Sequence, residues 1–208
     1  MKDFGLVVIG AHFGVWLSEK ISYYKNTNIL LIEPVPYNYK VLKEKFKENK
    51  NISICTNVIF SENLKKNFYF VKEKSVPKLG KHWASGIGSF DKKHILNHRS
   101  KRFKIQDDDV GCIEIDFITF DKLVDKYKIG SIENLQIDVE GAEYEILKSI
   151  NFEKIKINSL QFESKHFDGT FKTGSKLETI KQKLLNYGYN LTQIDKENIL
   201  AKKKSIFD

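Results

Sequence analysis

Apolar runs near the start of the chain alternate with amphipathic segments. The runs cover residues 6–9, 29–32 and 52–58, and the continuous apolar character of the first two is typical of parallel strands buried on both faces. Residues 15–24 and 38–48 carry apolar side chains at helical spacing, which predicts the connecting helices. Strands and helices that alternate in this way favour an α/β sheet.

The same alternation returns in the second half of the chain. Thr119 is placed to cap a helix, and the runs 135–138 and 157–162 predict two more buried strands. Residues 189–202 predict a closing hairpin. We therefore predict a single domain over residues 1–208, built on a doubly wound, Rossmann-like α/β sheet with an antiparallel edge hairpin.

Residues 62–116 interrupt the alternation. The stretch is rich in lysine and irregular, with short strands predicted only at 68–71 and 112–115. We interpret it as an insertion or lid-like segment, because long loops in compact domains are commonly lids or binding loops. Within it, residues 83–90 combine aromatic rings, glycines and hydroxyls, a composition that suits the cover of a pocket. A plain surface loop is the equally weighted alternative.

The composition favours a cytoplasmic protein. No apolar run approaches the roughly 20 residues that cross a bilayer, so we expect no membrane span. The first residues lack the pattern of a secretory signal. The two cysteines, Cys55 and Cys112, show neither CxxC spacing nor the pattern of a disulfide framework. A reducing compartment is therefore expected.

The formal net charge of +8 raises the question of an anionic partner. Lysine supplies most of the positive charge and is spread along the whole chain. Base recognition leans on arginine, whose planar fork pairs bidentately, so nucleic acid is the less favoured partner. The excess charge is compatible with an anionic small-molecule or glycan acceptor, such as a phosphorylated sugar.

Small and polar residues follow three successive predicted strands, which predicts a cofactor site. Glu33 and Pro34 follow the second strand, and Asn57 and Val58 follow the third. The turn after the first strand contains Gly10, Ala11, His12, Phe13 and Gly14. An acid such as Glu33 can accept hydrogen bonds from both hydroxyls of an adenosine ribose, and Asn57 can contact the adenine edge. The glycine spacing differs from GxGxxG, which argues against a nicotinamide dinucleotide.

Acidic residues and a histidine follow the next two strands, where we expect the chemistry. Asp138 ends one buried strand, Glu140 lies on the turn after it, and Glu163 and His166 follow the other. A carboxylate and an imidazole there can act as general base for a substrate hydroxyl. Glu143 falls in the first turn of a helix, where an acid gains from the helix dipole, so we interpret it as structural.

Metal binding is the less favoured use of these groups. Asp138, Glu163 and His166 offer ligands that suit a magnesium or calcium ion, but they have no fixed short spacing. The histidines of the 62–116 segment are too irregularly spaced to argue for ligation; they are His82, His94 and His98. Hydrolase and phosphate-binding motifs, GxSxG and the P-loop, are absent from the sequence.

These motifs resemble those of the FkbM methyltransferases, a family of class I S-adenosylmethionine (SAM)-dependent enzymes. The most specific match is residues 136–143, QIDVEGAE, which is close to the Asp-Val-Glu-Gly-x-Glu hallmark. Residues 10–14, 30–36 and 162–166 are similar to further motifs of the family. The resemblance implies a seven-stranded sheet, SAM as methyl donor, S-adenosylhomocysteine (SAH) as product, and usually O-methylation of a sugar, glycan or related small molecule.

For such a methyl transfer, the residues at the strand ends suggest roles. Glu163 or His166 would deprotonate the acceptor hydroxyl, and Asp138 or Glu140 would orient it. The family commonly has Asp where this chain has Val8, so another group, such as Asp138, would organise the methionine end of the cofactor. The alternatives are a nucleic-acid methyltransferase and a protein that binds the adenosine cofactor without catalysis.

Overall fold

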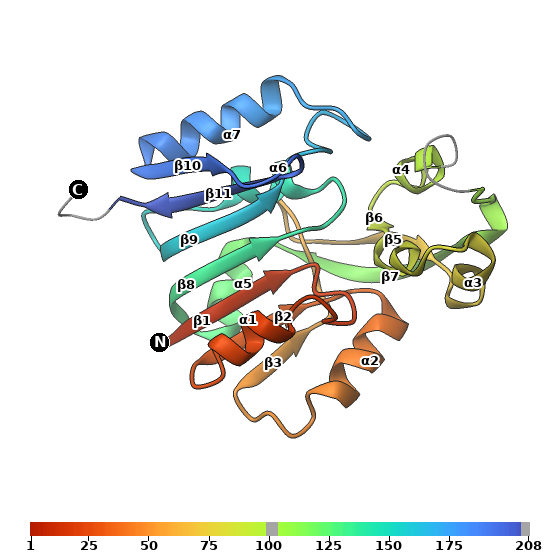
Figure 1. Ribbon diagram of the computed structural model, residues 1–208, viewed down its shortest axis with the longest axis horizontal. Helices are drawn as coiled ribbons and strands as arrows, with labels where there is room; N and C mark the ends of the chain where they lie inside the picture. Colours follow the sequence, from red (N-terminus) through yellow and green to blue (C-terminus); the bar gives the residue numbers. More distant parts are fainter. Residues whose placement is uncertain (99–103, 205–208) are drawn as a thin grey trace.

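A computed structural model describes residues 1–98 and 104–204, and its centre is a seven-stranded sheet (Figure 1). The strand order is β10-β11-β9-β8-β1-β2-β3. In chain order, these strands are β1 (Lys2–Ile9), β2 (Asn28–Ile32), β3 (Ile52–Cys55), β8 (Ile129–Ile137), β9 (Lys156–Glu163), β10 (Tyr189–Gln193) and β11 (Asn198–Lys203).

The direction of the strands creates a crevice beside β1. The pairs β1–β2, β2–β3, β1–β8 and β8–β9 are parallel, whereas β11 is antiparallel to both β9 and β10. The chain builds outward from β1 to β3 and later resumes at β8, on the other side of β1. Ligands of such sheets bind at the carboxyl ends of the strands where the order reverses. The predicted doubly wound sheet with an antiparallel edge hairpin is confirmed.

Helices cover both faces of this sheet. On one face, α1 (Ser18–Tyr23) and α2 (Pro36–Lys45) pack on alternate residues of β1 and β2. On the other face, the core includes residues of α5 (Phe120–Tyr127), α6 (Glu143–Ser149) and α7 (Ser175–Asn186). Because successive side chains of a strand point to opposite faces, Val7 and Ile9 join the second core while Leu6 and Val8 join the first.

A second sheet, of four strands in the described chain, lies beside the carboxyl ends of the first (Figure 1). Its order is β4-β7-β5-β6. The strands are β4 (Val58–Ile59), β5 (Leu64–Val71), β6 (Gly88–Ser89) and β7 (Val110–Ile118). Short helices flank them: η1 (Glu73–Ser75), α3 (Val76–Leu79), η2 (His82–Gly86), α4 (Lys92–Asn97) and η4 (Asp107–Asp109). Apolar side chains of this segment form a core of their own. Whether it acts as a lid stays a prediction.

Some boundaries differ from those predicted. The first helix begins only at Ser18, and Val15 and Trp16, expected on its inner face, are 64% and 47% exposed. Val58 pairs with Phe117 of β7 and so belongs to the second sheet. β5 and β7 are longer than the short strands predicted, because they pair along the whole of β5. Hydrogen bonds to the partner strand stabilise this lysine-rich stretch, although its sequence shows no clean alternation of apolar and polar residues. In the part of the chain that the structure covers, every helix is too short or too polar to cross a membrane.

Candidate active site

A pocket opens at the carboxyl ends of the parallel strands. Its empty space, counted together with its open mouth, is about 560 Å³. Six residues predicted for the cofactor line it: Gly10, Glu33, Pro34, Asn57, Val58 and Asp138. The 62–116 segment adds Gly86, Gly88, Ser89 and Phe90 to its wall. The pocket therefore lies between the main sheet and the 62–116 segment.

The rest of the glycine turn does not line the pocket and packs against other parts of the protein. Ala11 is fully buried in the core under α1 and α2, and Gly14 packs against Leu42 and Phe46. His12 and Phe13 also lie outside the pocket wall. At Gly10, φ is +91° and a Cβ would lie 1.7 Å from the carbonyl oxygen of Asp138. Only glycine allows β1 and β8 to approach this closely.

Glu33 holds the glycine turn in place. Its Oε2 accepts a hydrogen bond from the backbone N–H of His12 at 2.8 Å, and its Oε1 accepts one from the N–H of Val35 at 2.9 Å. The side-chain amide of Asn38 lies 3.4 Å from Oε1. Burial raises the pKa of Glu33 to about 7, although these hydrogen bonds lower it. The carboxylate thus organises the loop as well as facing the pocket.

Glu33 gives a pH-dependent stability. A pKa raised from 4.5 to about 7 means that the folded protein binds the proton more tightly than the unfolded chain. The contribution is fully present below about pH 4.5 and is lost as pH rises through 7, by roughly 3 kcal/mol at most. We measure the free energy of unfolding by urea titration at pH 5 and at pH 8. Between these two pH values it should fall less for Glu33→Gln than for the wild type. Parallel pH profiles would contradict this assignment.

The ring of His12 joins the glycine turn to the 62–116 segment. It is buried, and its Nε2 lies 2.6 Å from the hydroxyl of Ser85. Asn38 donates a hydrogen bond to the carbonyl of Ser85 at 2.8 Å. Sequence reasoning included Ser85 in the predicted pocket cover but missed Asn38 and the contact with His12, because no local pattern links residues this far apart. The glycine turn, α2 and η2 thus meet at Ser85.

Asn57 is held by other parts of the protein. Its side-chain oxygen accepts a hydrogen bond from Lys126 at 2.8 Å, and its nitrogen lies 3.3 Å from the carbonyl of Asp116. Its place on the pocket wall agrees with the prediction, but its amide bonds to the protein. A contact between this side chain and adenine stays a prediction.

Three predicted catalytic carboxylates gather next to the pocket. Asp138, Glu140 and Glu163 each offer an oxygen within 4.8 Å of the others. Glu140 has a left-handed φ of 55° and Gly141 one of 116°, so the chain turns sharply after β8. Glu143 accepts hydrogen bonds from the N–H groups of Val139 and Gly141, each at 2.9 Å, which holds that turn.

Glu163 is the most deeply buried of the three. It is 5% exposed, and one of its oxygens pairs with Lys165, which also pairs with Glu197 at 3.1 Å. Burial, together with the charges of Glu140 and Asp138, raises the pKa of Glu163 to about 9. Glu163 therefore holds a proton at neutral pH.

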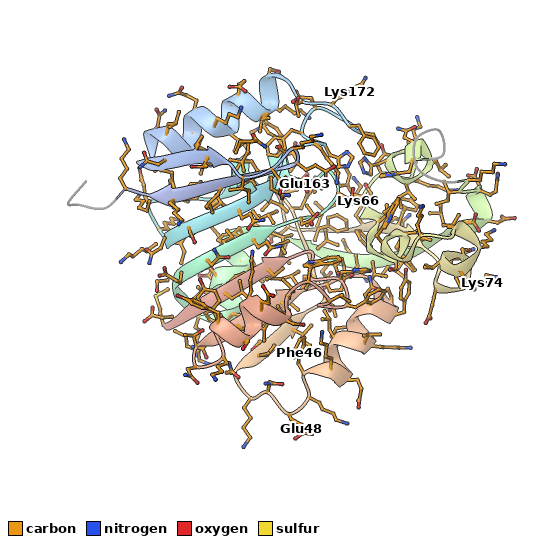
Figure 2. The ribbon with its side chains drawn as sticks, viewed as in Figure 1. Phe46, Glu48, Lys66, Lys74, Glu163 and Lys172 are labelled. Carbon is orange, nitrogen blue, oxygen red and sulfur yellow. The ribbon has the colours of Figure 1, made fainter. Side chains whose placement is uncertain are left out.

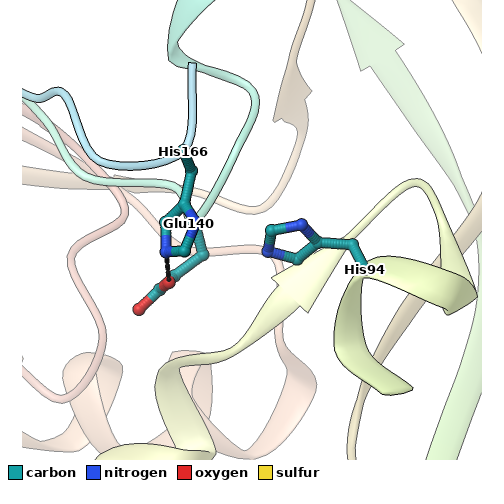
Figure 3. Close-up of side chains that lie close together, drawn as sticks. All are labelled: His94, Glu140 and His166. Atoms are coloured by element: carbon teal, nitrogen blue, oxygen red, sulfur yellow. Dashed lines mark ion pairs between the residues drawn. The ribbon is translucent and has the colours of Figure 1, made fainter. Parts of the chain in front are cut away.

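The two ring nitrogens of His166 have different neighbours. Its Nδ1 accepts a hydrogen bond from the backbone N–H of Phe171 at 2.9 Å. Its Nε2 lies 3.0 Å from an oxygen of Glu140 and 3.9 Å from one of Glu163. Since Nδ1 is the acceptor, a neutral imidazole has its ring proton on Nε2, the nitrogen that lies beside Glu140 (Figure 3).

His94 completes the cluster, and sequence reasoning set it aside. Its ring centroid lies 5.2 Å from that of His166 and 5.3 Å from that of His98. His94 and His98 are four residues apart at the end of α4, so they share a face. That spacing was the one local signal available; the partner, His166, is distant in the sequence.

The comparison with protein families decides the identity of this arrangement. Residues 9–191 match the model of the methyltransferase FkbM domain. The chain belongs to the FkbM methyltransferase family. It is accordingly a SAM-dependent methyltransferase, as the strand-end motifs predicted. A comparison with curated protein sequences found no match.

Several solved methyltransferase structures are similar to this FkbM protein. Precorrin-6y C5,15-methyltransferase from Geobacter metallireducens GS-15 has 12% identity and a TM-score of 0.47, covering 98% of this chain and 82% of that one. The fibrillarin pre-rRNA processing protein of Methanococcus jannaschii has 11% identity and a TM-score of 0.46, covering 98% and 68%. A methyltransferase from Pyrococcus furiosus has 10% identity and a TM-score of 0.41, covering 99% and 78%.

Proposed function

We propose that this FkbM protein transfers a methyl group from SAM to a hydroxyl of a sugar, glycan or related small molecule. The observation that carries the proposal is the double position of Asp138. Asp138 lines the pocket, and its carboxylate also belongs to the acidic cluster with Glu140 and Glu163. A proton-accepting group therefore lies at the border between the pocket and a polar region where an acceptor can approach.

The pocket suits the cofactor. Gly10 brings backbone rather than a side chain to its floor, and Glu33 has oxygens at its edge. Apolar residues from both sheets supply walls for a purine ring; among them are Val35, Val58 and Phe90. SAM, when bound, supplies a methyl group already activated by a positively charged sulfur. The protein's task is then to align the acceptor oxygen with that methyl group and to exclude water.

We assign the role of general base to Asp138. His166 is a poor base here, because Nδ1 already accepts the Phe171 N–H, which leaves Nε2 as the nitrogen that holds the ring proton. Glu163, with a pKa of about 9, is protonated at neutral pH. As the acceptor oxygen forms its bond to the methyl carbon and the carbon–sulfur bond breaks, Asp138 would take the hydroxyl proton. The products are a methyl ether and SAH.

An anionic acceptor is supported by charge near the pocket. Phe90 lines the pocket, and the ammonium group of Lys66 lies 5.4 Å from its ring centroid. Figure 2 labels Lys66 beside the second sheet. Together with the net charge of +8, this favours acceptors that carry phosphate or carboxylate.

The lid-like role of the 62–116 segment is part of the proposal, and Ser85 tests it. Removing the hydroxyl that meets His12 should loosen the contact between this segment and the glycine turn. For Ser85→Ala we expect SAH to dissociate roughly 3- to 10-fold faster in stopped-flow measurements, the effect of about 1 kcal/mol. Ser149→Ala removes a hydroxyl that bonds within α6 and should leave the rate unchanged. Equal rates in both variants would argue against a cover.

The proposed function is tested in two stages. The first is calorimetric titration with SAH, with NADH as control; we expect micromolar binding of SAH alone. The second is transfer of radiolabelled methyl groups from SAM to a panel of neutral and anionic sugars, glycans, and RNA. Transfer to a sugar hydroxyl supports the proposal. Transfer to RNA alone, or SAH binding without transfer to any acceptor, would contradict it.

A further inference from the structure

Two imidazoles and a carboxylate converge next to Asp138. His94, Glu140 and His166 each offer one ligand-type atom, and these atoms all lie within 4.8 Å of one another. Figure 3 shows the carboxylate of Glu140 below the ring of His166, with the ring of His94 to the right and the ion pair to His166 drawn as a dashed line. This cluster is distinct from the pocket wall, which contains none of the three.

Three separate segments bring these side chains together. His94 comes from α4 beside the second sheet, Glu140 from the turn after β8, and His166 from the segment after β9. The His166 side chain is fully buried and that of Glu140 is 17% exposed. A Cβ on Gly141 would lie 3.1 Å from the ring of His94, so the imidazole rests directly on the Glu140 turn. The arrangement is packed in place.

The surroundings of the cluster are strongly acidic. Asp138 and Glu163 place oxygens within 4.8 Å of an oxygen of Glu140, and Glu143 is buried beneath the same turn. Lys165 pairs with Glu163 and with Glu197. The carboxylates of Asp138 and Glu140 repel one another at this distance, and a divalent cation relieves that repulsion.

We propose that His94, Glu140 and His166 bind one divalent transition-metal ion. A pair of imidazoles with one carboxylate suits zinc, iron or cobalt, whereas magnesium and calcium prefer oxygen ligands alone. Ligands at about 2.1 Å from an ion lie about 3 to 4 Å from one another, so the present spacing needs only a small contraction. Three protein ligands leave coordination positions open for an acceptor oxygen or water.

The hydrogen bonds of the rings show how each would bind. Nδ1 of His94 lies 3.2 Å from the hydroxyl of Thr170, which makes Nε2 the ligand atom. On His166 the ion would take the place of the proton on Nε2, a buried nitrogen that makes no hydrogen bond within the described chain and lies 3.0 Å from Glu140. That proton then moves to Nδ1, so the N–H of Phe171 must turn away. Gly169 and Phe171 both have positive φ, 118° and 56°, in the segment that would adjust.

The proposal is tested by ion binding alone, so it can fail or succeed independently of the proposed methyl transfer. Protein freed of metal with a chelator is titrated with ZnCl₂ and CoCl₂, and with MgCl₂ as the hard-ion control. We expect one zinc or cobalt ion per chain with micromolar or tighter affinity, and at least 10-fold weaker binding of magnesium. Cobalt should give visible absorption bands without a thiolate charge-transfer band, which excludes the exposed Cys112 as ligand.

Variants locate the ion. His94→Gln and Glu140→Gln should each weaken zinc binding at least 10-fold, whereas Glu178→Gln, on the exposed face of α7, should not change it. Thermal unfolding of the metal-free variants checks that they fold. Zinc should also change hydrogen exchange at the Phe171 amide. The absence of stoichiometric binding at 100 μM zinc, a concentration of the order of 100-fold above a micromolar Kd, would overturn the proposal. Binding that survives both cluster substitutions would overturn it as well.

Discussion

Replacing Asp138 by asparagine is expected to lower kcat for methyl transfer by about 10²- to 10⁴-fold, the usual contribution of a general base. Asparagine keeps the size of the side chain but cannot take the acceptor proton. Because the backbone of residue 138 and not its charge meets Gly10, the turn should persist. SAH affinity should then stay within about 3-fold of the wild type, and the unfolding midpoint should be little changed.

Asp121→Asn is the matched control for this prediction. Asp121 is exposed on α5, and its ion pair with Lys154 spans 3.9 Å, so its loss should affect neither turnover nor stability. Wild-type turnover in Asp138→Asn would remove Asp138 from the mechanism. A loss of SAH affinity equal to the loss of kcat would assign it to cofactor binding instead.

Gly10→Ala is expected to have the largest effect on folding and cofactor binding. A Cβ at this position would overlap the carbonyl oxygen of Asp138 at 1.7 Å, and φ of +91° is unfavourable for any other residue. The clash is with backbone, so β1 and β8 must separate. We expect a loss of more than about 3 kcal/mol in the free energy of unfolding, measured with urea, and no detectable SAH binding.

Gly80→Ala separates the two causes of that effect. Gly80 also has a positive φ, +65°, but a Cβ there meets nothing within 4 Å. It should cost only the backbone strain, about 1 kcal/mol, and leave SAH binding unchanged. If both variants lose the same stability, the close approach of β1 and β8 is not the reason for glycine at position 10.

Two buried glutamates of the site serve the loops more than the chemistry. Glu33 bonds to the N–H of His12 in the turn after β1, and Glu143 bonds to the N–H groups of Val139 and Gly141 after β8. Both loops return the chain at the edge of the sheet where the pocket opens. Each loop leaves donors that no strand partner satisfies, and a carboxylate satisfies them. The shape of the pocket therefore depends on acids that need not touch the acceptor.

Much of this arrangement is readable from local pattern. Continuous apolar runs predict buried parallel strands, and the carboxyl ends of parallel strands meet at one edge. That logic was enough to place Gly10, Glu33 and Asp138 around one pocket, which the structure has. It also explains why the family motifs are short segments at strand ends. The strand pattern and the family motifs both depend on residues close together in the sequence.

The second sheet and the histidine cluster were decided by tertiary structure. β5 pairs with β7 along its whole length although its own residues 65–67 are lysine, lysine and asparagine, because the partner strand supplies the hydrogen bonds. His94 and His166 are 72 positions apart and meet only because the second sheet packs on the edge of the first.

The protonation states of Glu163 and His166 were also decided by tertiary structure. The residue types at positions 163 and 166 predict an acid and a base, but their chemical states come from their surroundings. Glu163 keeps its proton because it is buried among other acids, and His166 carries its proton on Nε2 because a backbone N–H from Phe171 takes Nδ1. Periodicity and spacing determined the sheet and the edge on which this protein works. Burial and hydrogen bonds between distant segments, which have no local pattern, decided what each group there can do.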